Sequence, residues 1–70
     1  MDDAEQACQA FLKQQPNSAD GWHLMGLMAH HKKLLDTAIA HYNKVLELDP
    51  NHADTYNNLA VALHEQNKLE

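Results

Sequence analysis

The chain has 70 residues, with ten acidic residues against five lysines, no arginine and a formal net charge of −5. Such a length allows at most one small domain, and the acidic excess argues against nucleic acid as a ligand, because phosphate binding needs a basic surface. No apolar stretch approaches the roughly 18 residues that a membrane span requires. The single cysteine, Cys8, rules out an internal disulfide and fits the reducing cytoplasm, where we expect the protein.

Two amphipathic helices are predicted in the first half of the chain. The first covers about residues 2–15, where apolar side chains recur every three or four positions on one face. Pro16 ends this helix, and Asn17 or Ser18 can cap the next one. The second predicted helix covers residues 19–32.

The second half of the chain repeats this organisation. A third helix is predicted over residues 35–48 and ends before Pro50, because proline lacks an amide donor and disfavours helical geometry in the residue before it. Asn51 or His52 can cap a fourth helix, predicted to run from residue 53 to about residue 66. The short connections favour antiparallel neighbours, and no strand pattern is present.

Residue types recur at a fixed offset of 34 positions along the chain. Pro16 matches Pro50 at this offset, and Trp22 matches another aromatic residue, Tyr56. A constant period of this length indicates a helical repeat array. Further pairs at the same offset are Asn17 and Asn51, Ala19 and Ala53, Asp20 and Asp54, and His30 and His64.

The recurring residues resemble the tetratricopeptide repeat (TPR) family. The matching positions are Trp22 as the opening aromatic, Met25-Gly26 in the place of Leu-Gly, Ala38 and Tyr42 in the second helix, and Pro50 as the closing proline. The resemblance implies an all-α module of about four helices, built from antiparallel helix-turn-helix repeats in an α-α superhelix. Within this single module, residues 1–16 form the second helix (helix B) of a preceding partial repeat, residues 17–50 one full repeat, and residues 51–70 the first helix (helix A) of a following partial repeat.

Small residues explain how the predicted helices pack. Gly26 and Ala38 lack bulk, so two helices can approach closely, while Trp22 and Tyr42 fill the space beside that contact. Lys33 stands where glycine often closes helix A, which requires either a lysine in left-handed conformation or a different turn. The expected core residues are Trp22, Met25, Gly26, Ala38, Tyr42, Tyr56, Leu59 and Ala60.

The resemblance also implies a concave groove, lined by the A helices, that binds a peptide. Asn58 stands out there, because its amide can both donate to and accept from a peptide backbone; the alternative is a solvated polar residue. Asp20, Asp54 and Glu65 favour a partner with basic or apolar side chains. The predicted peptide-binding residues are Asp20, His23, Leu24, Leu27, His30, His31, Asp54, Asn57, Asn58, Val61, His64 and Glu65.

Catalysis and metal binding are not expected. No two of the six histidines are four positions apart, the helical spacing that places two rings on one metal ion. No glycine-rich phosphate loop or nucleophile elbow is present, and Cys8 fits a buried apolar position. We therefore expect no cofactor and no bound metal, and we predict a non-enzymatic chain.

The predicted function is that of a protein–protein interaction module that holds a peptide or protein in the A-helix groove. Two alternatives stay open. The module could be the substrate-recruiting arm of a larger enzyme. It could also be an assembly element that forms a homodimer or exchanges helices through its uncapped terminal helix, where Leu59, Leu63 and Leu69 lie on the uncovered side.

Overall fold

A computed structural model describes the backbone of residues 3–69 and the side chains of residues 6–68. The four predicted helices are α1 (Asp3–Gln14), α2 (Ala19–His31), α3 (Leu35–Leu48) and α4 (Ala53–Leu69). The largest departure from prediction is at the end of α4, which continues beyond residue 66. Asp2, the predicted first residue of the first helix, lies outside the described residues.

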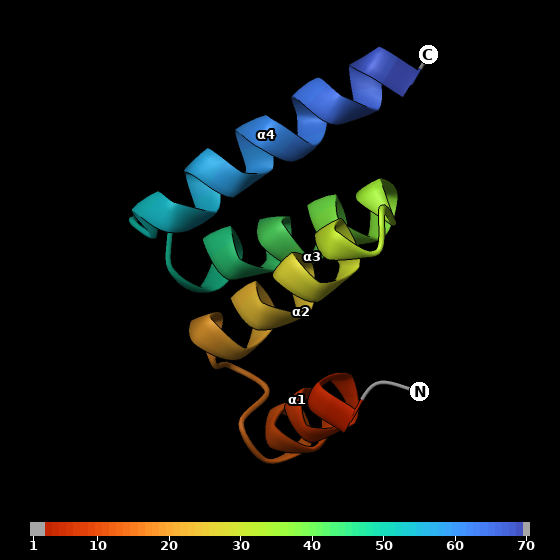
Figure 1. The fold of residues 1–70 in the computed structure, drawn as a ribbon. Coiled ribbons are helices and arrows are strands. Elements are labelled where there is room, and N and C mark those ends of the chain that lie inside the picture. Colours follow the sequence, from red (N-terminus) through yellow and green to blue (C-terminus); the bar gives the residue numbers. More distant parts are fainter. Residues whose placement is uncertain (1–2, 70) are drawn as a thin grey trace.

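The helices stack in chain order, with α1 at one end of the stack, α2 and α3 as an antiparallel pair in the middle, and α4 at the other end (Figure 1). α4 runs in the same direction as α2. The Cα atoms extend over 37 × 32 × 14 Å, so the stack is flat. None of the helices within residues 3–69 has the length and apolar content needed to cross a lipid bilayer.

The two A helices, α2 and α4, begin in related ways. The side chain of Ser18 caps α2 by accepting a hydrogen bond from the amide of Gly21 at 3.1 Å. One turn further on, the indole Nε1 of Trp22 donates to the carbonyl of Pro16 at 2.9 Å. In α4, the hydroxyl of Tyr56 donates to the carbonyl of Pro50 at 2.9 Å. The 34-residue period is therefore visible in the hydrogen bonds as well as in the sequence.

The core lies where α2, α3 and α4 meet. Tyr42, Ala38 and Ala62 are completely buried there. Gly26 faces the ring of Tyr42 so closely that a Cβ atom on it would lie 2.6 Å from Cδ1 of the ring. The missing side chain of Gly26 is thus what lets α2 approach the tyrosine of α3. The cluster also contains Ala29 and Leu35, with Ile39 and Leu59 packed against it.

Two of the predicted core residues are exposed rather than buried. Tyr56 is 50% exposed and Ala60 is also exposed, whereas Trp22 and Met25 are half-buried. The equivalent residues of α2 are covered by α3: the ring of His41 lies 5.6 Å from that of Trp22, and Tyr42 covers Gly26. Within residues 3–69, no helix covers the corresponding side of α4.

α1 packs on the first turn of α2 through Cys8 and Leu12, which are both buried. The Cys8 thiol donates a hydrogen bond to the carbonyl of Gly21 at 3.3 Å. Burial raises the pKa of this thiol, so it stays protonated at neutral pH. Cys8 therefore acts as a packing residue and is unsuited to be a nucleophile.

Lys33 adopts the left-handed conformation, with φ 65°, at the end of α2. Its amide donates to the carbonyl of His30, and the amide of Leu34 donates to the carbonyl of Ala29, at 3.0 and 2.9 Å. This pair of hydrogen bonds is a Schellman motif. The left-handed position of this motif is usually occupied by glycine. Of the two possibilities that the sequence allows, the lysine adopts the strained conformation and the turn is preserved.

We expect Lys33→Gly to stabilise the fold by about 0.5–1 kcal/mol, because relief of the Cβ strain exceeds the extra freedom that glycine gives the unfolded chain. Urea unfolding followed by circular dichroism measures the effect. Lys33→Ala is the control, since it removes the ammonium group but keeps the strain. Equal stability of the two variants would contradict this explanation.

Candidate binding groove

α2 and α4 lie side by side and in register. His23 contacts Asn58 and His30 contacts Glu65, and both pairs are 35 positions apart in the sequence. A constant separation shows that the two helices are parallel at this contact. The surface that they form together, made of the twelve residues predicted to bind a peptide, is called the A-helix groove below.

The twelve groove residues divide into two groups. The four members of the two cross-helix pairs, His23, His30, Asn58 and Glu65, are half-buried and form the floor. The other eight are exposed and form the rim: Asp20, Leu24, Leu27, His31, Asp54, Asn57, Val61 and His64. The structure therefore pairs four of the predicted residues across the two helices, and these floor residues bind one another.

His30 connects the core to the groove floor. Its Nε2 donates to Oε2 of Glu65 at 3.1 Å, which leaves Nδ1 of a neutral ring to accept from the hydroxyl of Tyr42 at 3.3 Å. Burial, followed by the charge of Glu65, raises the pKa of Tyr42, so the hydroxyl keeps its proton. This chain fixes the position of α4 relative to α2 and α3.

Glu65 is already engaged within the chain. The hydrogen bond from His30, aided by the charge of Lys33, lowers the pKa of this carboxyl, although partial burial acts in the opposite direction. The ammonium of Lys33 lies 3.6 Å from Oε1. Both carboxylate oxygens of Glu65 therefore have partners within the chain.

Asn58 has a partner in the same chain. Its Nδ2 donates to Nε2 of His23 at 2.8 Å, which requires His23 to be neutral and to carry its proton on Nδ1. One amide donor of Asn58 is thereby used. Only the second N–H and the carbonyl oxygen of this side chain remain for a ligand.

His52 is a site residue that the sequence reasoning did not include. Its Nδ1 accepts from the buried hydroxyl of Thr55 at 2.8 Å, and its Nε2 lies 3.4 Å from Oδ1 of Asp20 on α2. Its ring is 4.9 Å from that of His23. The sequence could have pointed to His52, because it lies 34 positions after Ser18, the residue that caps α2.

Stability is expected to fall on acidification because of His23. Burial and the neighbouring His52 lower the pKa of His23, and the charges of Asp54 and Asp20 only partly oppose this. The unfolded chain then binds the proton more readily, so the contribution is present above about pH 6.5 and is lost as the pH falls through the lowered folded value. Unfolding midpoints in urea at pH 7.5 and 5.5 measure the difference.

His23→Gln is the control for this experiment, since its amide oxygen can still accept from Asn58 but does not titrate. We expect the variant to lose less stability than the wild type between the two pH values. An unchanged pH dependence would show that other groups cause the loss. Glu65 does not interfere, because its lowered pKa keeps it charged throughout this range.

The rim offers apolar surface and an open hollow. Between the polar ends of the two helices, the side chains of Leu24, Leu27 and Val61 are 53%, 37% and 48% exposed. A hollow of about 440 Å³ is lined by Leu27, His30, His31 and Lys33. The rim therefore combines exposed apolar side chains with an open hollow.

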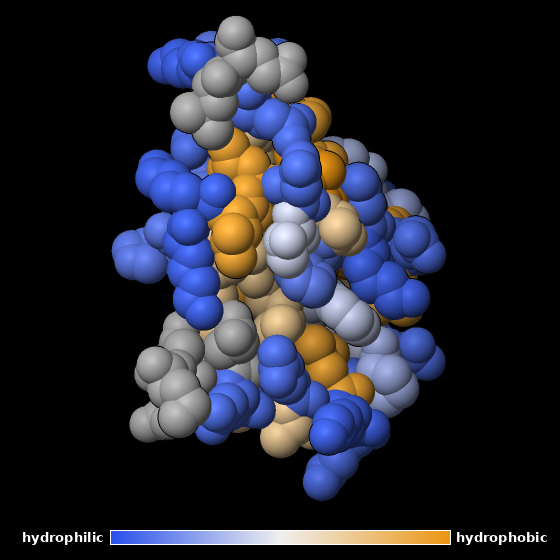
Figure 2. Space-filling view, turned by 90° about the vertical axis from the view of Figure 1, so that its right-hand side faces the viewer, coloured by the Kyte–Doolittle hydropathy of each residue, from blue (hydrophilic) through white to orange (hydrophobic). Residues whose placement is uncertain are grey.

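A second hollow lies where α2 and α4 end. It has a volume of about 380 Å³, is mostly apolar, and is lined by Leu35 and by the side chains of Lys33, Glu65 and Lys68. Figure 2 looks onto this end of the molecule and shows an apolar strip between hydrophilic residues. Apolar surface therefore extends to the end of the two helices.

The histidines His23, His30 and His52 contact other side chains of the chain. Among the described side chains, no three histidine, cysteine or carboxylate groups come together in a way that could hold a metal ion. His23, His30 and His52 instead join α2 to α4 and its first turn. Their role is to set the geometry of the groove.

A stack of antiparallel helix pairs with two parallel A helices side by side defines an α-helical repeat module. The sequence model of the TPR repeat matches residues 30–67, and the chain belongs to this family. TPR repeats are typically interaction modules without catalytic activity.

The chain is also similar to part of a much larger protein. It is 35% identical over 66 residues to the probable biofilm formation methyltransferase WspC of Pseudomonas putida (strain KT2440). The alignment covers 94% of this chain but only 16% of that protein.

Proposed function

We propose that the chain binds another protein or peptide through the A-helix groove. The observation that carries this proposal is the exposure of Leu24, Leu27 and Val61 on the face where α2 and α4 run in register. Exposed apolar side chains that are grouped on one face and bordered by polar residues are typical of protein-binding surfaces. Membership of the TPR family supports the same function.

The floor of the groove supports this proposal because it is already ordered. The contacts of His23 with Asn58 and of His30 with Glu65 hold α2 and α4 together without a ligand. A partner then binds a preformed surface, which reduces the entropy cost of association.

The net charge of −5 disfavours nucleic acids and anionic membranes as partners. We infer a cytoplasmic location from the unpaired Cys8.

Two exposed residues of α4 provide a matched test. Val61 and Leu63 are 48% and 44% exposed, but only Val61 belongs to the groove. Peptides are first selected from a display library on the wild-type chain, and their affinities are then measured for Val61→Glu and Leu63→Glu. We expect Val61→Glu to weaken binding about tenfold, as for a central interface residue, and Leu63→Glu to change it little.

Circular dichroism of both variants confirms that the helices are intact. Equal losses in the two variants, or a larger loss in Leu63→Glu, would contradict binding in the groove.

The similarity to a methyltransferase favours a second candidate function. In a methyltransferase that carries this module, the groove would recruit the protein substrate for a catalytic domain elsewhere in the polypeptide. Val61→Glu would then raise KM for the protein substrate and leave kcat unchanged. An unchanged KM would exclude recruitment through the groove.

The uncovered side of α4 favours an assembly role as a third candidate. Tyr56 and Leu63 are half exposed there, and a second copy of the chain could cover them. Sedimentation velocity over a range of concentrations tests this, with Leu63→Glu expected to abolish association. A wild-type chain that remains monomeric at the highest concentration would contradict self-assembly, whether by a homodimer or by helix exchange.

A further inference from the structure

We propose that the segment held in the A-helix groove is an amphipathic helix that lies antiparallel to α2 and α4. Its first turn carries acidic residues and its last turn carries basic residues. This inference rests on the proposed binding function and specifies the conformation, direction and charge pattern of the partner.

The pairing within the groove favours a helical partner over an extended one. An extended peptide leaves its backbone amides and carbonyls open, so the groove would have to supply hydrogen bonds to them. The floor side chains suited to this are already paired with one another: Asn58 donates one of its two N–H groups to His23, and Glu65 binds His30. Leu24, Leu27 and Val61 remain exposed, and they suit a helix whose backbone is already hydrogen-bonded internally.

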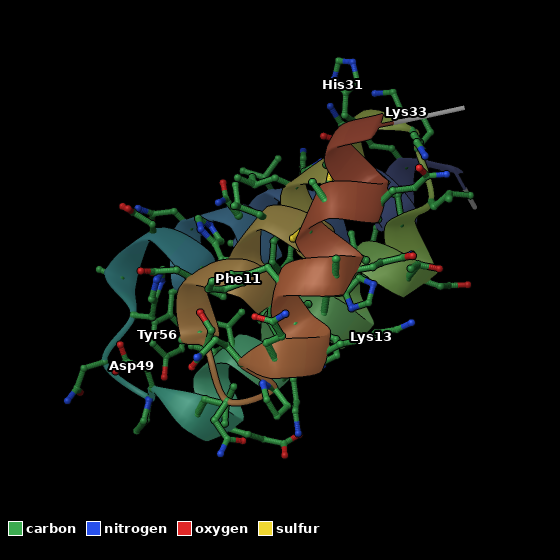
Figure 3. All side chains as sticks on the ribbon, turned by 90° about the horizontal axis from the view of Figure 1, so that it is seen from below. Phe11, Lys13, His31, Lys33, Asp49 and Tyr56 are labelled. Carbon is green, nitrogen blue, oxygen red and sulfur yellow. The ribbon has the colours of Figure 1, made fainter. Side chains whose placement is uncertain are left out.

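The two ends of the groove carry opposite charges. Asp20 and Asp54 lie in the first turns of α2 and α4. Lys33 follows the end of α2, and Lys68 lies in the last turn of α4. Lys33 and Lys68 are 35 positions apart, the same separation as in the two cross-helix pairs, and both line one hollow. Figure 3 shows His31 and Lys33 at one end of the molecule and Asp49, which precedes α4, at the other.

Glu65 does not reverse the charge of the basic end. Its carboxylate is bound by His30 at 3.1 Å and is 3.6 Å from the ammonium of Lys33. The side chain of Lys33 nevertheless remains 76% exposed, so it can also contact a partner. His31 adds a further donor beside it, in the wall of the hollow that also contains Leu27.

Helix dipoles determine the direction of the partner. Acidic residues are stabilising in the first turn of a helix and basic residues in its last turn. A partner helix with this ordinary pattern places its acidic turn near Lys33 and Lys68 only if it runs antiparallel to α2 and α4. From Asp20 to His31 the groove spans about 16 Å at 1.5 Å per residue, so it accommodates about three turns of a partner helix.

Two peptides of identical composition test the direction. Both carry the same apolar stripe and a side-chain staple that fixes the helix; one has glutamates in the first turn and lysines in the last, and the other has the reverse. At low ionic strength we expect the first to bind the wild-type chain about tenfold more tightly, with the difference decreasing as salt is added. A third peptide with a central proline, which prevents a continuous helix, is expected to bind weakly.

The double variant Asp54→Lys, Lys68→Glu is the decisive control, since it reverses the charge of one residue at each end. Because Asp20 and Lys33 are unchanged, the charges at each end then largely cancel. We expect the preference for the first stapled peptide to be lost, which no difference between the peptides themselves could explain. Equal affinity of the two stapled peptides for the wild-type chain would overturn the direction, and tight binding of the proline peptide would overturn the helix. If Val61→Glu still weakened binding about tenfold in either case, the groove function would stand and only this inference would fail. If no peptide bound, the inference would fail as well.

Discussion

Tyr42→Ala is expected to remove most of the stability of the fold. Tyr42 is completely buried at the centre of the core, and truncation of a large buried aromatic costs about 3–5 kcal/mol. A chain of 70 residues has a total free energy of unfolding of roughly 4–10 kcal/mol. The substitution also removes the hydroxyl that donates to His30, which holds α4 through Glu65. Thermal unfolding followed by circular dichroism should show a large fall in Tm.

Tyr42→Phe separates the two contributions, because it keeps the ring and removes only the hydroxyl. We expect this variant to lose about 0.5–1.5 kcal/mol, the usual net worth of one hydrogen bond. A Tyr42→Ala chain that melted near the wild-type temperature would show that the ring does not hold the three helices together.

Gly26→Ala is expected to destabilise the fold by about 1–3 kcal/mol, because the new methyl group collides with a ring that is packed on all sides. This result is opposite to the gain of about 1 kcal/mol that glycine-to-alanine substitution brings inside an exposed helix. Urea denaturation measures the sign directly. An increase in stability would mean that the ring of Tyr42 moves easily and that the close approach of α2 and α3 is not needed.

A double variant links the effect to this contact. Combined with Tyr42→Leu, Gly26→Ala should cost less than it does alone, because the smaller side chain leaves room for the methyl group. The two free-energy changes should therefore not add. Additive effects would indicate that Gly26→Ala acts elsewhere.

The sequence predicted the helices well because local signals determine them. Pro16 and Pro50, which recur at an offset of 34 residues, separate the helical segments, and the small size of Gly26 indicates a close approach of two helices there. The same recurrence misplaced Tyr56 and Ala60. Equivalent positions are buried only where an equivalent helix covers them, and in residues 3–69 that helix is present for α2 but not for α4.

The pairing of the groove residues could not be predicted from the repeat alone. Equivalent residues are 34 positions apart, but the contacts between α2 and α4 join residues 35 positions apart. This shift of one position depends on how the two helices pack in three dimensions. It makes Asn58, rather than Asn57, the partner of His23. Whether the groove residues bind a peptide remains a prediction.

The hydrogen bonds from Trp22 to Pro16 and from Tyr56 to Pro50 each join residues only six positions apart. Both can form as soon as the residues concerned have left the ribosome, without waiting for distant parts of the chain. Contacts of such short range lower the entropic cost of nucleation and favour rapid folding. Each proline turn can therefore order its own helix start during synthesis, and the packing of neighbouring helices can follow.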